Sequence, residues 1–99
     1  MRQSRLQWDT ERRRRTRRAM DEARVVLLER SGGHCEGRDF SPHCTGVASD
    51  AHHIWPSDRD RNTHDPDRMA YLCRWCHQEV HANPNLANKA GLLKRDGED

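Results

Sequence analysis

The chain has 99 residues, of which 32% are hydrophobic and 34% are charged. This length fits one domain, and so low an apolar fraction predicts a thin core, because small domains bury proportionally less of their surface. No apolar run near the N-terminus resembles a signal peptide, and none approaches the roughly 20 residues of a membrane-spanning helix. These features predict a cytoplasmic protein, in which cysteines stay reduced.

The N-terminal region is strongly basic, although the net charge of the chain is only +2. Residues 1–18 are polar and predict an arm that is either helical or disordered. Guanidinium groups bind phosphate oxygens bidentately, so a dense cluster of them favours nucleic acid as a partner, with a solvated helix face as the alternative. The cluster consists of Arg12, Arg13, Arg14, Arg15, Arg17 and Arg18.

Residues 19–93 are expected to form the folded domain, followed by a polar tail over residues 94–99. Apolar residues recur at helical spacing and predict a helix over residues 19–31, which packs on the domain and ends at Gly32 and Gly33. The apolar positions of this helix are Ala19, Met20, Ala23, Val26 and Leu27.

The elements expected after this helix are short. Residues 47–55 predict a strand or hairpin, and residues 69–72 predict a second strand. Between them, residues 57–68 are rich in Asp, Arg and Asn and are expected to form an exposed loop. Residues 75–81 predict a helix, and a last short helix is expected over residues 86–93.

Four cysteines can close one tetrahedral metal site. Cys73 and Cys76 have two residues between them, a spacing that lets two thiolates converge on one ion, whereas Cys35 and Cys44 have eight. A thin core in a reducing compartment needs a staple other than disulfides, and a structural zinc ion contributes roughly 10–16 kcal/mol of apparent binding free energy to folding. We therefore predict a structural zinc held by all four cysteines, with unbound thiols as the alternative.

Four histidines are spaced to build a second, open site. His77 and His81 are four residues apart, so on a helix they project from one face and can share one metal ion. His52 and His53 are adjacent on an extended segment, so their side chains point to opposite sides. One of this pair can then bind a metal ion while the other faces a substrate. An open imidazole site is typical of catalytic metal centres, whereas a closed thiolate site is usually structural.

The order of these residues resembles the HNH endonucleases, nucleases with a ββα-metal core, and in particular the small cysteine-rich forms common in bacteria and phages. The resemblance covers roughly residues 33–83, about half of the chain. It implies an α+β fold, a small zinc-stapled ββα-metal domain, which here follows the basic arm. The motifs that carry it are Cys35-Glu36, Cys44-Thr45-Gly46-Val47-Ala48, His52-His53-Ile54 and Leu72-Cys73-Arg74-Trp75-Cys76-His77 with His81.

The resemblance also implies roles for the four histidines. His53 would be the general base that takes a proton from the attacking water, work that suits a histidine with a pKa near 6.5. His52, His77 and His81 would hold a divalent cation that stabilises charge on the leaving 3′ oxygen. Imidazole ligands suit Zn, Ni, Co or Mn, and Mg is common where oxygen ligands dominate. The implied reaction nicks or cuts DNA and leaves 5′-phosphate and 3′-hydroxyl ends.

One position departs from the family. The asparagine that braces the loop and orients the base histidine is expected five or six residues before Cys73, where this chain has Asp67 and Arg68. Asp67 could accept the same hydrogen bonds, and Asn62 could substitute from the loop. Three loop arginines are candidates for contact with the scissile phosphate, with simple solvent exposure as the alternative: Arg59, Arg61 and Arg68.

The sequence thus predicts a metal-dependent DNA endonuclease of HNH type in the cytoplasm of a bacterium or of a phage-infected host. DNA is the expected partner, and phage packaging machinery is a further candidate. The departure at Asp67 and Arg68 supports an alternative, a catalytically weak or inactive zinc-stabilised DNA-binding module such as a DNA-packaging accessory. A zinc-stabilised adaptor for protein interactions is a third hypothesis. Cleavage of DNA with added metal ions distinguishes the first hypothesis from the other two.

Overall fold

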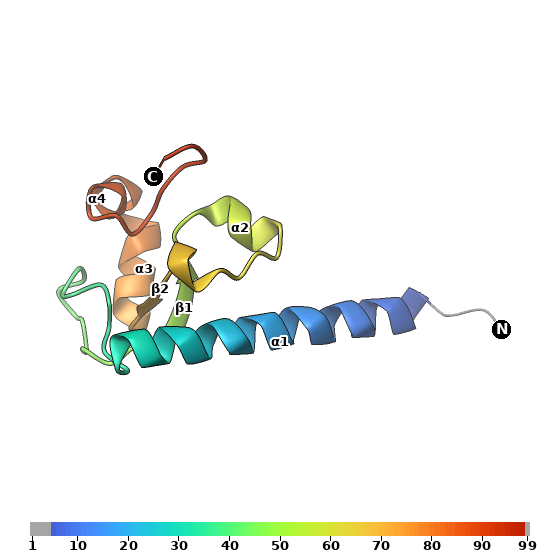
Figure 1. Cartoon of the computed structure of the whole chain (residues 1–99). Helices are drawn as coiled ribbons and strands as arrows, with labels where there is room; N and C mark the ends of the chain where they lie inside the picture. The colour runs from blue at the N-terminus through green and yellow to red at the C-terminus, as the bar shows by residue number, and fades with distance from the viewer. Residues whose placement is uncertain (1–4, 99) are drawn as a thin grey trace.

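The computed structural model describes residues 5–98, with side chains described from Thr10 onward. The fold is α+β, with a two-stranded antiparallel sheet between a long N-terminal helix and shorter C-terminal helices (Figure 1). The first four residues of the predicted arm and the last residue of the predicted tail lie outside this range. None of the described helices is long and apolar enough to cross a membrane. The elements are α1 (Arg5–Ser31), β1 (Asp50–His53), α2 (Pro56–Asp60), the 3-10 turn η1 (Pro66–Arg68), β2 (Met69–Leu72), α3 (Arg74–Ala82) and α4 (Pro84–Lys89).

The predicted arm and the predicted packing helix form one continuous helix. At 1.5 Å per residue α1 is about 40 Å long, and its N-terminal part extends beyond the rest of the domain (Figure 1). The helix ends where predicted, because Gly32 and Gly33 have φ angles of 66° and 83°. Glycine adopts this left-handed conformation without a Cβ clash and so terminates the helix.

A narrow apolar stripe packs α1 on the sheet. Ala23 and Leu27 are buried with Met69 of β2, and Met20 is partly buried beside them. The prediction that Val26 belongs to this stripe is wrong, since its side chain is 46% exposed. Adjacent residues of a helix point about 100° apart, so burial of Leu27 turns its neighbour towards solvent.

Arg30 holds the C-terminal end of α1 against the domain. Its guanidinium forms an ion pair with Glu36 at 2.6 Å and donates to the carbonyls of Pro66 at 2.8 Å and Met69 at 2.9 Å. The helix is therefore fixed both to the loop that follows it and to the start of β2.

The register of the sheet decides which side chains face which helix. Asp50 of β1 lies opposite Leu72 of β2, and Leu72 packs in the core cluster that contains the cysteines. Ala51 packs against the α1 cluster. Because successive side chains of a strand point to opposite faces, Asp50 and His52 lie on the α3 side of the sheet, and Ala51 and His53 lie on the α1 side.

Two predicted segments differ from the structure. Residues 57–68, expected to be a loop, contain most of α2 and all of η1, because each begins with a proline, Pro56 or Pro66, at the start of its helical turn. Proline is favoured there, since the first turn of a helix does not use its N–H groups. For the same reason α4 begins at Pro84 rather than at residue 86, and it ends at Lys89 rather than at residue 93. The strand predicted within residues 47–55 covers only Asp50–His53. The second predicted strand and the helix predicted after it are confirmed as β2 and α3.

Candidate functional site

Four cysteine sulfurs gather between the loop after α1 and the start of α3. The Sγ atoms of Cys35, Cys44, Cys73 and Cys76 all lie within 4.8 Å of one another, and no disulfide joins them. Cys73 Sγ and Cys44 Sγ are 3.8 Å apart. Two sulfurs bound to one tetrahedral zinc ion at about 2.3 Å each are also separated by about 3.8 Å. The predicted grouping is confirmed, and the cluster is positioned to hold a metal ion such as zinc.

Backbone N–H groups point at these sulfurs. The N–H groups of Cys73 and Gly37 donate to Cys35 Sγ at 3.2 and 3.4 Å. Burial opposes ionisation of the Cys73 thiol, but the N–H groups of Cys76 and Thr45, with hydrogen bonds from the side chains of Cys76 and Cys35, lower its pKa to about 6. Burial raises the pKa of Cys35 and Cys76. Donors of this kind stabilise a thiolate over a thiol, and the thiolate is the form that binds metal.

Three imidazole rings meet on the α3 side of the sheet. Strand alternation directs His52 towards α3, on which His77 and His81 are one turn apart. Ring nitrogens of the three residues lie within 4.8 Å of one another. The ring centroid of His52 lies 5.1 Å from that of His77 and 5.8 Å from that of His81. The three histidines that the resemblance implies as metal ligands are thus close together, and we call them the imidazole cluster.

Two rings of the imidazole cluster are held through their outer nitrogens. His52 Nε2 lies 2.6 Å from the carbonyl oxygen of Leu92, and His77 Nδ1 lies 2.9 Å from a carboxylate oxygen of Asp50. Both acceptors require an N–H at these atoms, which leaves His52 Nδ1 and His77 Nε2 as lone-pair donors. Metal-binding histidines usually donate their other N–H to a carbonyl or carboxylate in this way. The chemistry of the donor set therefore fits a metal ion.

The protonation states of these residues also suit metal binding. His52 is 3% exposed, and burial lowers its pKa to about 4, although the Leu92 carbonyl opposes this shift. Burial and the nearby His77 also lower the pKa of His81. Burial disfavours the Asp50 carboxylate, but the hydrogen bonds from His77 and Ser49, with the charges of His77 and Arg74, together lower the pKa of Asp50. At neutral pH, His52 is a neutral imidazole and Asp50 is ionised.

His53 lies on the other side of β1, beside His64. His53 Nε2 is 3.0 Å from His64 Nδ1, and His53 also forms a backbone hydrogen bond with Thr63. Burial, followed by the neighbouring His64, lowers the pKa of His53. His53 is therefore unprotonated at neutral pH and able to accept a proton. The second nitrogen of His64, Nε2, is buried and has no hydrogen-bond partner among the described residues.

The imidazole cluster and His53 line one hollow of about 360 Å³. Its other walls come from α1, through Met20, and from the segment after β1, through Arg59, Asn62 and His64. His52, the predicted metal ligand, and His53, the predicted base, thus lie on opposite faces of β1. Both side chains nevertheless line the same hollow.

Asp67 does not brace His53. Its backbone N–H donates to the Asp65 carboxylate at 3.0 Å, and in the described part of the chain no hydrogen bond joins Asp67 to His53. The hydrogen-bond partners of the His53 ring are instead Thr63 and His64.

Arg68 occupies a structural position next to the hollow. Its guanidinium forms an ion pair with the buried Asp58 at 2.6 Å and lies 4.0 Å from the ring centre of Trp55. Both contacts fix α2 against η1. Of the other loop arginines, Arg59 lines the hollow, and Arg61 is exposed.

Asp50, His64 and Leu92 join the site without having been identified from the sequence. A signal existed for Asp50, because it stands two residues before His52 and must share its face of the strand. His64 and Leu92 carry no such signal, since tertiary packing alone brings them to the site.

Comparisons of the chain with protein-family models, with curated proteins and with solved structures found no match.

Proposed function

We propose that this chain is a metal-dependent endonuclease of HNH type that hydrolyses phosphodiester bonds of DNA. The observation that carries the proposal is the arrangement across β1. The imidazole cluster lies on one side of the strand, the neutral His53 lies on the other, and both line one hollow. A binding module needs neither an open set of metal ligands nor a base beside it. The order of the cysteine and histidine motifs, which resembles that of HNH nucleases, supports the same conclusion.

His53 acts on the attacking water. Its lowered pKa keeps the ring unprotonated at neutral pH, so the ring can accept a proton as the water oxygen bonds to phosphorus. His64 Nδ1, 3.0 Å away, provides a second nitrogen with which that proton can be shared. The bond from phosphorus to the 3′ oxygen breaks, which leaves a 5′-phosphate and a 3′-hydroxyl.

The imidazole cluster would hold a divalent cation, which supplies Lewis-acid stabilisation of the charge on the leaving oxygen. The Leu92 carbonyl and the Asp50 carboxylate orient His52 and His77 for this role. Arg59 at the wall of the hollow can bind a neighbouring phosphate oxygen through its guanidinium fork.

The cysteine cluster stabilises the start of α3, the helix that carries His77 and His81. Cys73 is the N-cap of α3 and accepts a hydrogen bond from Cys76 N–H in the first turn, directly before His77. A zinc ion on the four sulfurs therefore fixes the start of α3 and with it the position of His77.

A plasmid-nicking assay tests the proposal. Protein with one zinc per chain is mixed with supercoiled DNA, and Mg, Mn, Co, Ni or Zn is added singly. We expect nicking with at least one ion, and we expect His53→Ala to abolish turnover while folding and DNA affinity are retained. His34→Ala is the matched control, because His34 is an exposed histidine away from the hollow.

Two results would contradict the proposal. Turnover retained by His53→Ala would refute the assignment of the base. Failure of the wild-type protein to cleave with every ion would favour the second candidate, a zinc-stabilised DNA-binding module. One observation supports that candidate. Arg68 stands at a position expected for the family asparagine and is engaged with Asp58.

A further inference from the structure

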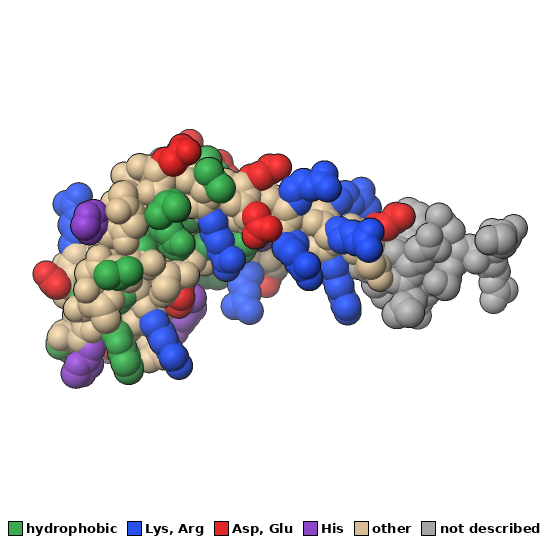
Figure 2. Space-filling model, turned by 90° about the horizontal axis from the view of Figure 1, so that it is seen from below, with side chains coloured by type: hydrophobic (Ala, Val, Ile, Leu, Met, Phe, Trp, Pro, Cys, Tyr) green, Lys and Arg blue, Asp and Glu red, His purple; other side chains and the backbone are tan. Residues whose placement is uncertain are grey.

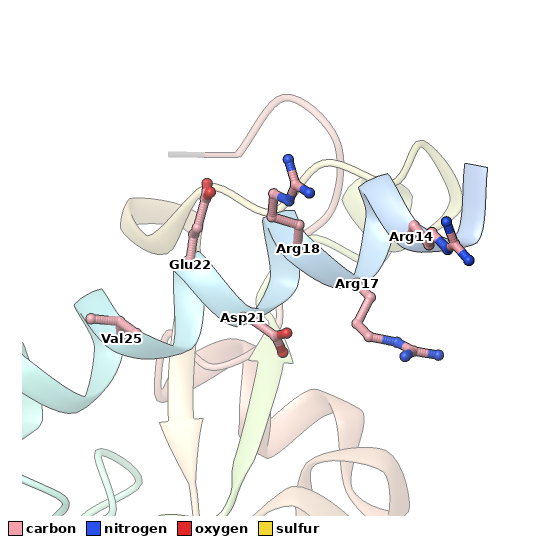
Figure 3. Close-up of a pocket in the computed structure, with 6 residues that line it drawn as sticks. All are labelled: Arg14, Arg17, Arg18, Asp21, Glu22 and Val25. Carbon is pink, nitrogen blue, oxygen red and sulfur yellow. The ribbon is translucent and has the colours of Figure 1, made fainter. Parts of the chain in front are cut away.

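The arginines of α1 lie on two different faces of the helix. One hollow, on the side of the helix that faces the domain, contains Asn62 from the loop after α2 opposite α1 side chains; its α1 residues are Arg12, Arg13, Thr16 and Arg17. A second hollow lies on the outward side of α1 and is shown in Figure 3; its residues are Arg14, Arg17, Arg18, Asp21, Glu22 and Val25. Thr16 and Met20 continue the stripe of Ala23 and Leu27 along the helix, which is why the first hollow faces the domain.

The two faces differ in charge. Among the described residues that line the domain-facing hollow, none is acidic. On the outward face, Asp21 and Glu22 follow Arg17 and Arg18 by four residues, the spacing at which opposite charges attract on a helix (Figure 3). Carboxylates there repel an incoming polyanion. A phosphate chain is therefore attracted more strongly to the domain-facing side.

The domain-facing hollow continues into the candidate site. Asn62 lines both hollows, and Met20, one turn after Thr16, lines the hollow that contains His53. The described lining of the hollow that contains His53 is also free of acidic residues. His53 is on the α1 side of the sheet, so the arm approaches the base rather than the imidazole cluster.

The dimensions suit a nucleic-acid strand. Arg13 stands seven residues before Met20, a rise of about 10 Å along the helix. Successive phosphates of one DNA strand advance by about 3.4 Å along the axis of the duplex. On a duplex whose axis runs along α1, Arg13 thus lies about three phosphates from Met20 at the edge of the site. Figure 2, seen from the outward side of α1, shows basic side chains along this half of the helix with acidic side chains among them.

The lining of the domain-facing hollow favours a duplex. Among the described residues that line it none is aromatic, although aromatic stacking is the usual means of holding single strands. None of these described lining residues has an apolar side chain that could insert into a lipid surface. What remains is a set of guanidinium groups that recognise phosphates without reading bases.

We propose that Arg12 and Arg13, with Thr16 and Asn62, form a track that holds the backbone of a DNA duplex and leads it to the His53 side of the site. Arg17 lines both hollows and is assigned to neither face. Arg14 and Arg18, on the outward face, do not take part. The track rests on the proposed function in one respect, since the site to which it leads is the proposed nuclease centre.

Two double variants with the same change of charge test the track. Arg12→Gln with Arg13→Gln removes two groups from the track, and Arg14→Gln with Arg18→Gln removes two from the outward face. All four side chains are exposed, and glutamine has a helix propensity close to that of arginine. Both variants are made in full-length protein that also carries His53→Ala, so that bound DNA is not cut.

Binding of a labelled duplex is measured by fluorescence anisotropy between about 50 and 200 mM salt. The track pair should weaken binding and reduce the slope of log K against log salt by about 1.8, or about 0.9 for each lost phosphate contact. The outward pair should leave the slope and the affinity unchanged. Equal losses in both variants, no loss in either, or tighter binding of single strands or anionic vesicles than of duplex would overturn the track. Because the base is absent, the result is independent of cleavage. If only the track pair weakens binding but the wild-type protein cleaves no DNA, the proposed nuclease activity is refuted and the proposed DNA track stands.

Discussion

Asp50→Asn gives the sharpest test of how the imidazole cluster is organised. The substitution keeps the size of the side chain but replaces the carboxylate that lies 2.9 Å from His77 Nδ1 with a neutral amide. Loss of a carboxylate partner typically lowers the metal affinity of a histidine site by about 10–100-fold. His77 and Asp50 have side-chain exposures of 29% and 34%, so solvent screens part of their interaction. We therefore expect the lower end of that range, about tenfold or about 1.4 kcal/mol.

The assay is calorimetric titration of Co²⁺ into protein that already carries one zinc per chain. Asp67→Asn is the matched control, because it is the same substitution at an exposed carboxylate that has no hydrogen bond to a histidine of the site among the described residues. A His77→Ala background completes the test, since Asp50→Asn should have no further effect once the ring is absent. Equal Co²⁺ affinity of Asp50→Asn and Asp67→Asn would refute the reasoning.

Two further predictions concern the zinc staple and the base. Cys73→Ser should release zinc and unfold the domain, because a structural zinc contributes roughly 10–16 kcal/mol of apparent binding free energy, whereas domains are stable by only roughly 5–15 kcal/mol. Metal analysis measures the zinc content and circular dichroism measures folding. A folded variant with full zinc content would contradict this prediction. The acid limb of the nicking rate at saturating metal should have its midpoint below pH 6.5, because burial and His64 lower the pKa of His53 from its usual value and the ring must be unprotonated to act. An acid limb with its midpoint above pH 6.5, with each of two metals, would show that another group controls the reaction.

Spacing within single elements was enough to predict much of the site. Cys73 and Cys76 share one helix start, His77 and His81 share one helix face, and strand alternation separates the two histidines of β1. Each of these relations depends on the geometry of one helix or strand, which the sequence pattern determines locally. The boundaries of the segment between the strands were less predictable, because its two short helical turns depend on where each proline sits.

The partners of these residues were not predictable in the same way. Leu92 is 40 residues from His52, and its carbonyl reaches the ring only because the segment after α4 folds back over the sheet. His64 stands in a polar loop whose sequence resembles that of any exposed segment, and it meets His53 only because Arg68 and Asp58 hold α2 against η1.

By itself, then, the sequence determined the cysteine and histidine groups, the strand that separates His52 from His53 and the basic character of the arm. The tertiary structure decided that the arm is continuous with the packing helix, and it decided which arginines face the site. Burial of Ala23 and Leu27 against Met69 sets the rotation of α1, and a helix that is fixed at one end carries that rotation along its whole length. The composition of the arm is a property of the chain, but the direction of its charges relative to the site depends on contacts between distant elements.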